Sequence, residues 1–94
     1  MSVRVHVKQF VTGEGLSAFP ALLEEHRRAA AAFPGFISLH GCSSQCEGNA
    51  ELEITLEFQD ESLLKKWRSS APHERIAADY RRYWTREPEI AISL

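Results

Sequence analysis

The segment from Glu51 to Phe58 constrains the fold most, because its apolar and polar side chains alternate without interruption. This period of two is typical of a β-strand with one buried face, and a shift of one residue would move every apolar side chain into water. We therefore expect a sheet with one covered face and one open face. The side chains predicted to face the core are Leu52, Ile54, Leu56 and Phe58.

Three other segments also favour strands. Residues 3–11 alternate at Val3, Val5 and Val7, the segment from Phe36 to Cys42 follows a Pro-Gly break, and Ile90, Ile92 and Leu94 end the chain. In the second strand we expect Ile37 and Leu39 on the core face, with Phe36, Ser38 and His40 opposite. The polar stretch from Ser43 to Ala50 contains Gly48-Asn49 and predicts a hairpin loop.

Helical periodicity fills the two gaps between these strands. The turn from Thr12 to Gly15 is expected to precede a helix over residues 17–33, with Ser17 as N-cap and Pro20 in the first turn. Asp60 or Ser62 is expected to cap a short helix, and Pro72 to restart a longer one that runs to about Trp84.

The resulting order β-α-β-β-α-β predicts a ferredoxin-like α+β fold, in which helices cover one face of a four-stranded antiparallel sheet. A chain of 94 residues supports one hydrophobic core, so residues 1–94 are expected to form a single domain. Ile90 and Ile92 are expected under the helices. The opposite face carries a mixture of acidic, basic, hydroxyl and aromatic groups.

Composition excludes several classes of partner. The formal net charge of −2 gives no electrostatic reason to bind nucleic acid. No apolar run is long enough to span a membrane, and Arg4, His6 and Lys8 interrupt the first apolar segment, so a cytoplasmic location is the default expectation. Cys42 and Cys46 are expected to be free thiols, and together with His40 they do not form a recognised metal signature, so no metal site is predicted.

The segment Trp67-Arg-Ser-Ser-Ala-Pro-His73 is the strongest candidate for a site. Its Ser-Ser pair ends one helix and its proline opens the next, which brings an indole and an imidazole to the same end of the core. Trp67 is either a packing residue or a wall against which a planar ligand stacks. His73 either covers a helix end or is a base, kept neutral by the positive end of its helix.

Four more residues are candidates for contacting a ligand. Gln9 interrupts the apolar row of the first strand, which indicates either an amide in a pocket or a bulge. His26 lies on the apolar stripe of the first helix and is either a paired core residue or part of the site. Tyr80 and Tyr83 are core or rim aromatics whose hydroxyls could bind a substrate.

The order of elements and several motifs resemble the antibiotic biosynthesis monooxygenase family, whose small ferredoxin-like chains pair into a dimeric α+β barrel. The matching features are the Gly15 turn before an amphipathic helix, the sequence from Phe33 to Ile37, the strand Glu53 to Phe58, and the spacing of Trp67, Ser70 and His73. The resemblance covers nearly the whole chain. It implies a homodimer in which the mixed sheet faces meet, with Phe10, Phe36 and His40 among the residues turned away from the helices.

The resemblance also implies a reaction. Some members oxidise phenolic, hydroquinone-like or polyketide-like substrates with O₂, without metal or flavin, and this predicts a cofactor-independent monooxygenase or oxidase. Its catalytic residues would be His73 and Trp67, and its substrate-binding residues Gln9, His26, Phe36, Tyr80 and Tyr83. The main alternative is a dimeric module that binds a small ligand without catalysis. Haem degradation is less favoured, because Lys8 or Gln9 stands where haem-degrading members have Asn, and Ala77 where they have His.

Overall fold

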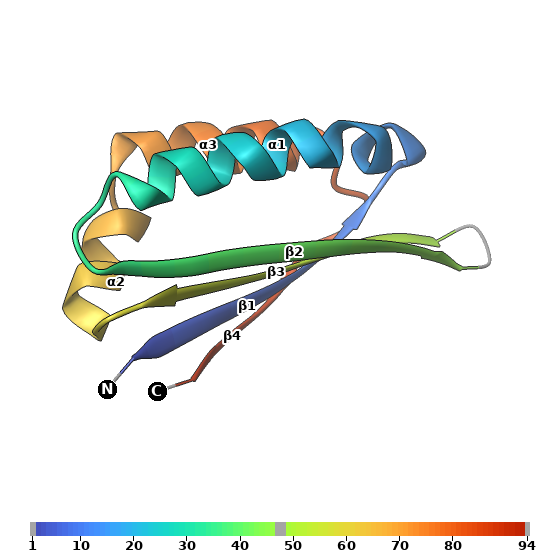
Figure 1. Ribbon diagram of the computed structural model, residues 1–94. Coiled ribbons are helices and arrows are strands. Elements are labelled where there is room, and N and C mark those ends of the chain that lie inside the picture. Colours follow the sequence, from blue (N-terminus) through green and yellow to red (C-terminus); the bar gives the residue numbers. More distant parts are fainter. Residues whose placement is uncertain (1, 47–48, 94) are drawn as a thin grey trace.

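The computed structural model describes residues 2–46 and 49–93, and it confirms the ferredoxin-like α+β architecture. Helices α1, α2 and α3 lie on one side of an antiparallel sheet with strand order β2-β3-β1-β4 (Figure 1). In chain order the elements are β1 (Val3–Val11), α1 (Gly13–Ala31), β2 (Phe36–Cys46), β3 (Asn49–Phe58), α2 (Glu61–Arg68), α3 (Ala71–Arg81) and β4 (Glu89–Ser93).

Helix α1 begins four residues earlier than predicted, and the expected turn from Thr12 to Gly15 is its first turn. Thr12 is the N-cap, and its hydroxyl oxygen accepts a hydrogen bond of 3.3 Å from the Gly15 amide. Ser17 and Pro20 therefore lie inside the helix. A side chain at position 15 would place its Cβ 2.8 Å from Val11 Cβ, so the glycine that suggested a turn permits close packing instead.

The β2–β3 hairpin is longer than expected. Most of the predicted loop from Ser43 to Ala50 is paired strand, with Ser43 opposite Leu52 and Gln45 opposite Ala50. Figure 1 shows this end of the hairpin projecting beyond the helices, so the β2 side chains there remain in water and carry no apolar alternation. The predicted Gly48-Asn49 turn lies partly outside the described residues.

An irregularity between Phe36 and Ser38 reverses the predicted facing of the start of β2. Phe36 pairs with Phe58, and the two rings meet edge to face at a centroid distance of 6.0 Å on the core side. Ile37 is the extra residue and is 45% exposed, while Leu39 is buried as expected. The prediction that Phe36 points away from the helices is therefore wrong, because a bulge shifts the alternation by one residue.

The core lies between the helices and the central strands β1 and β3. Its largest fully buried side chains are Trp67, Phe58, Leu39, Leu52, Ile54 and Val3. Ile90 and Ile92 pair with Val7 and Val5 and so belong to the same face, yet they are 51% and 49% exposed. The expectation that the helices cover them is wrong, because β4 is an edge strand beyond the reach of α1 and α3.

The open face of the sheet is a ladder of surface charges. Arg4 lies 3.6 Å from Glu57, and Lys8 lies 3.7 Å from both Glu51 and Glu53. Such exposed pairs stabilise a fold only slightly. Phe10, expected to be bare on this face, is half-buried under the guanidinium of Arg86, whose carbon lies 4.3 Å from the ring centroid.

The structure describes the side chain of one of the two cysteines. The thiol of Cys42 is free and exposed, whereas the side chain of Cys46 lies outside the described residues, so the count of two free thiols stays a prediction.

Across residues 2–46 and 49–93, no cluster of three His, Cys, Asp or Glu side chains could hold a metal ion. None of the described helices is long and apolar enough to cross a membrane.

Candidate functional site

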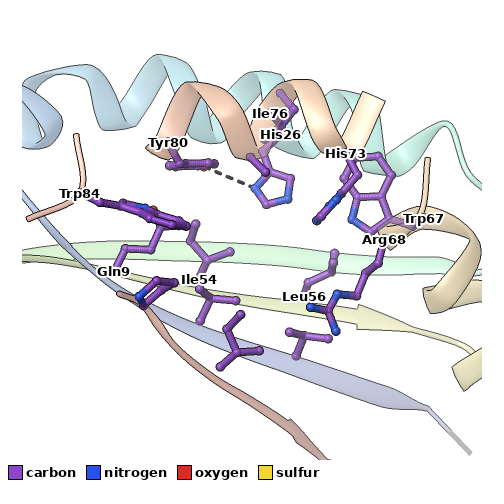
Figure 2. A pocket seen from close by; sticks show the side chains of 15 residues that line it. Gln9, His26, Ile54, Leu56, Trp67, Arg68, His73, Ile76, Tyr80 and Trp84 are labelled. Atoms are coloured by element: carbon purple, nitrogen blue, oxygen red, sulfur yellow. Dashed lines mark hydrogen bonds between the residues drawn. The ribbon is translucent and has the colours of Figure 1, made fainter. Parts of the chain in front are cut away.

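A cavity of about 140 Å³ lies between the sheet and the helices (Figure 2). Engineered cavities of about 150 Å³ hold one benzene molecule, so this partly open space holds one aromatic ring of a ligand. Apolar side chains from β1, β3 and α3 form most of its wall. Its polar or aromatic lining comes from every helix, from β1 and from the segment after α3, and consists of Gln9, His26, Trp67, Arg68, His73, Tyr80 and Trp84.

The junction of α2 and α3 places Trp67 and His73 together. Ser70 is the N-cap of α3: its Oγ accepts a hydrogen bond of 3.2 Å from the His73 amide and donates one of 2.6 Å to the Trp67 carbonyl. The sharp turn sets the two rings edge to face, with centroids 5.3 Å apart. The predicted proximity of indole and imidazole is present, and it depends on one serine.

His26 reaches the same cluster from α1. Its ring stacks on Trp67 with centroids 5.9 Å apart, and a hydrogen bond of 3.4 Å joins its Nδ1 to the Tyr80 hydroxyl. Burial, then the charges of His73 and Arg27, lower the pKa of His26 to about 4. Burial also raises the pKa of Tyr80. At neutral pH both side chains are therefore uncharged in an apolar setting.

His73 is the third residue of α3 and also has a lowered pKa. The helix N-terminus predicts this direction, but the largest cause is burial, followed by the nearby charge of Arg68, and Glu74 acts in the opposite direction. In the described part of the chain, His73 Nδ1 and Trp67 Nε1 are buried without a hydrogen-bond partner. Buried polar atoms are normally paired, so these two unsatisfied atoms mark the polar end of the cavity.

Gln9 is the one buried polar residue in the apolar face of β1, with 4% of its surface exposed. It lies opposite Leu52 in an unbroken register, which excludes the bulge that was the alternative explanation. Its Oε1 accepts a hydrogen bond of 2.7 Å from Trp84 Nε1. Because an indole only donates, this contact determines the amide orientation and leaves the Gln9 NH₂ group available to the cavity.

Sequence reasoning missed Arg68 and Trp84. Figure 2 shows Arg68 extending from α2 into the space between His73 and the sheet. Its position directly after Trp67, at the end of an apolar helix face, was a usable signal. Trp84 follows α3, and only the fold brings its indole to Gln9, which is 75 residues away in the sequence.

Two predicted ligand-binding residues lie outside the cavity. Phe36 packs on Phe58 because of the β2 bulge. Tyr83 is half-buried on the far side of the α3 terminus, where it lies next to Gly15 and where Arg82 stacks on its ring at 5.9 Å. The other five candidates, Gln9, His26, Trp67, His73 and Tyr80, all line the cavity.

Comparison with known proteins shows similarity in structure and not in sequence. No protein-family model and no curated protein matches the chain. Among solved structures, SnoaB from Streptomyces nogalater, a cofactor-independent oxygenase, is 15% identical, with a TM-score of 0.77 over 100% of this chain and 93% of that chain. A protein from Nitrosomonas europaea, provisionally assigned as an antibiotic biosynthesis monooxygenase, is 10% identical, with a TM-score of 0.84 over 98% and 88%.

A third similar structure is a dimeric protein of unknown function from Bacteroides fragilis. It is described as having a ferredoxin-like fold and is 11% identical, with a TM-score of 0.80 over 98% of this chain and 94% of that chain. Identities this low establish a shared fold and not a shared reaction. The predicted resemblance to antibiotic biosynthesis monooxygenases is thus confirmed at the level of the fold.

Proposed function

We propose that this chain, which has the fold of a cofactor-independent oxygenase, is an oxygen-dependent oxidase or monooxygenase of an electron-rich phenol, hydroquinone or polyketide-like aromatic, acting without metal or flavin. The observation that carries the proposal is the enclosed cavity, in which two imidazoles with lowered pKa values flank a buried indole. The fold similarity supplies the class of reaction, and the cavity supplies the groups.

The first step is removal of a proton from the substrate. His73 is the better base, because its Nδ1 has no partner in the described residues, whereas His26 already shares a hydrogen bond with Tyr80. A neutral imidazole can accept the hydroxyl proton of a phenol held against Trp67. Such general-base assistance typically contributes a factor of a hundred or more.

The second step is electron transfer from the resulting anion to O₂. The deprotonated ring is the reductant, so the substrate performs the redox step that a flavin or metal performs elsewhere. The apolar wall of the cavity keeps water from competing, and the Gln9 amide donates to a carbonyl or hydroxyl oxygen of the substrate. Trp67 and Tyr80 contact the aromatic ring of the substrate and orient its plane.

Oxygen uptake by metal-free protein tests this proposal against a panel of hydroquinones and anthrones. We expect uptake above the buffer rate for at least one compound, and a loss of about a hundredfold or more in His73→Ala. His40→Ala is the matched control, because His40 is exposed on the far edge of the sheet. Trp67→Phe should lower the rate, and Tyr83→Phe should retain it.

Two results would contradict the proposal. One is a panel that gives no uptake above buffer, and the other is His73→Ala turning over an active compound at the wild-type rate while its melting temperature is unchanged. Ligand binding without turnover would instead favour the non-catalytic binding module. Stoichiometric haem titration is the separate check on haem binding, and we expect no 1:1 complex.

We further propose that the chain works as a homodimer. The supporting observation is the edge strand β4, where Ile90 and Ile92 are about half exposed beside an unpaired strand edge. A second copy that covers these side chains would remove apolar surface from water on both chains. Ile90 also lines the cavity, so such a partner would complete its wall.

A further inference from the structure

The lining of the cavity is rich in hydrogen-bond donors and lacks acids. Gln9 presents its NH₂ group, Trp67 its unpartnered Nε1, and Arg68 its guanidinium. Among the residues that the structure describes, none that lines the cavity is Asp or Glu. A ligand that satisfies this set must bring acceptor oxygens, and a negative charge would pair best with Arg68.

Arg68 has no ionic partner of its own. The ion pairs found in the described residues involve Arg4, Lys8, His6 and several arginines of α1, α3 and the last loop, and none includes Arg68. Its side chain is directed into the cavity between His73 and the strands (Figure 2). A guanidinium presents a planar fork that matches a carboxylate in two parallel hydrogen bonds.

Positive charge also lies beside the cavity. Arg68 and His73 also line a shallow surface depression together with Lys65 and Ser69, which we call the outer hollow. This basic hollow stands out on a chain whose formal net charge is −2. Local positive charge raises the concentration of anions at an entrance and speeds their association.

We propose that the ligand of this cavity is an aromatic carboxylic acid, whose single ring occupies the enclosed space and whose carboxylate is held by Arg68 at the outer hollow. The inference rests on the proposed function for the location of the site, and it adds the class of substrate. It also separates two roles. Arg68 binds the carboxylate, which is already ionised in the free ligand. His73 accepts the proton that the substrate hydroxyl releases during turnover.

The test is equilibrium binding without O₂, so that affinity is measured apart from turnover. Benzoate and 4-hydroxybenzoate are each titrated beside the neutral amide of the same acid, and NMR of the two indole N–H groups reports on the cavity. We expect each bound acid to bind about tenfold more tightly than its amide and to shift the Trp67 signal. The preference should fall as salt rises.

Three variants test whether Arg68 is the side chain that binds the carboxylate. Arg68→Met should remove the preference for the acid, while Lys66→Met should change it less than about twofold, because Lys66 belongs to the same helix end but does not line the cavity. Arg68→Lys keeps the charge without the planar fork and should retain part of the preference. Unchanged melting temperatures show that the variants fold.

The proposal is overturned if no acid in the series binds, if acid and amide bind equally, or if Lys66→Met weakens the acid as much as Arg68→Met. These outcomes are distinguishable from failure of the oxidase proposal. Acid binding without oxygen uptake leaves the carboxylate site standing and removes the oxidase. Oxygen uptake from hydroquinones while acid and amide bind equally leaves the oxidase standing and removes the carboxylate site.

Discussion

At the scale of residues, the chemistry of this chain depends on a few polar groups held in apolar surroundings. Trp67 is fully buried and contacts His26, Phe33 and His73. Its packing role is thus shown, and its Nε1 is left without a hydrogen-bond partner among the described residues. Packing and ligand contact are not exclusive for an indole, because its apolar body and its one donor point in different directions.

The lowered pKa of His26 predicts a specific pH dependence of stability. Between about pH 6.5 and pH 4 the unfolded chain binds a proton on this residue and the folded chain does not, so stability falls with falling pH by roughly 3 kcal/mol at most. Below about pH 4 both states are protonated and the loss stops. Urea unfolding of wild type and His26→Phe across this range measures the effect.

We expect the difference in pH slope between wild type and His26→Phe to be confined to that range. His40→Ala serves as the control, since its side chain is exposed and should leave the wild-type slope intact. Equal slopes for wild type and His26→Phe would show that His26 is protonated equally in the folded and unfolded chains. Any pH dependence of stability in this range would then come from other titratable groups.

At the scale of elements, the ends of helices and strands differ most from the sequence predictions. Asp60, one of two expected caps, is the N-cap of α2, but α1 uses Thr12 where Ser17 was expected, and Ser70, expected to end one helix, caps the start of the next. Two glycines within the first turn of a helix mimic the signature of a loop. Only contact with Val11 and Tyr83 explains why position 15 must be glycine within a helix.

Capping can be tested with a matched pair of substitutions. Thr12→Ala removes the hydroxyl that accepts from the Gly15 amide, and we expect it to lower the free energy of unfolding by about 1 kcal/mol. Ser17→Ala lies within an exposed helical turn and should change it by less than about 0.5 kcal/mol. Urea denaturation gives both values. The reverse order would place the start of α1 at Ser17.

At the scale of the whole molecule, the sheet has two unequal faces and, at β4, an edge strand with exposed apolar side chains. The open face is occupied by charge pairs and the helix face by the core, while β4 leaves Ile90 and Ile92 half in water. The dimer predicted from the sequence relied partly on Phe36, which the fold turns inward. The proposal of a homodimer now rests on the exposed isoleucines of β4.

Light scattering at micromolar concentration tests the dimer. We expect wild type to have twice the mass of the chain and Ile92→Lys to shift toward monomer, because a buried unpaired charge at an interface is strongly unfavourable. Ile37→Lys places the same charge on an exposed isoleucine of the opposite edge strand and should leave the dimer intact. A monomeric wild type, or dissociation by Ile37→Lys alone, would contradict this interface.

Sequence patterns determined the order of elements, the facing of β3 and the meeting of Trp67 with His73, because each depends on side chains close together in the chain. Periodicity and capping act over one or two turns, and they can be recognised without a partner. Gln9 was singled out in the same way, as a polar residue in an apolar row.

Tertiary structure alone decided the rest. The bulge that turns Phe36 inward, the pairing of Gln9 with Trp84 and the contact of His26 with Tyr80 join residues whose positions become adjacent only after the sheet and helices pack. The unpartnered donors around the cavity are likewise a property of packing, because a donor lacks a partner only relative to everything that surrounds it. The sequence by itself therefore determined the scaffold, and packing decided which of its polar groups line the cavity.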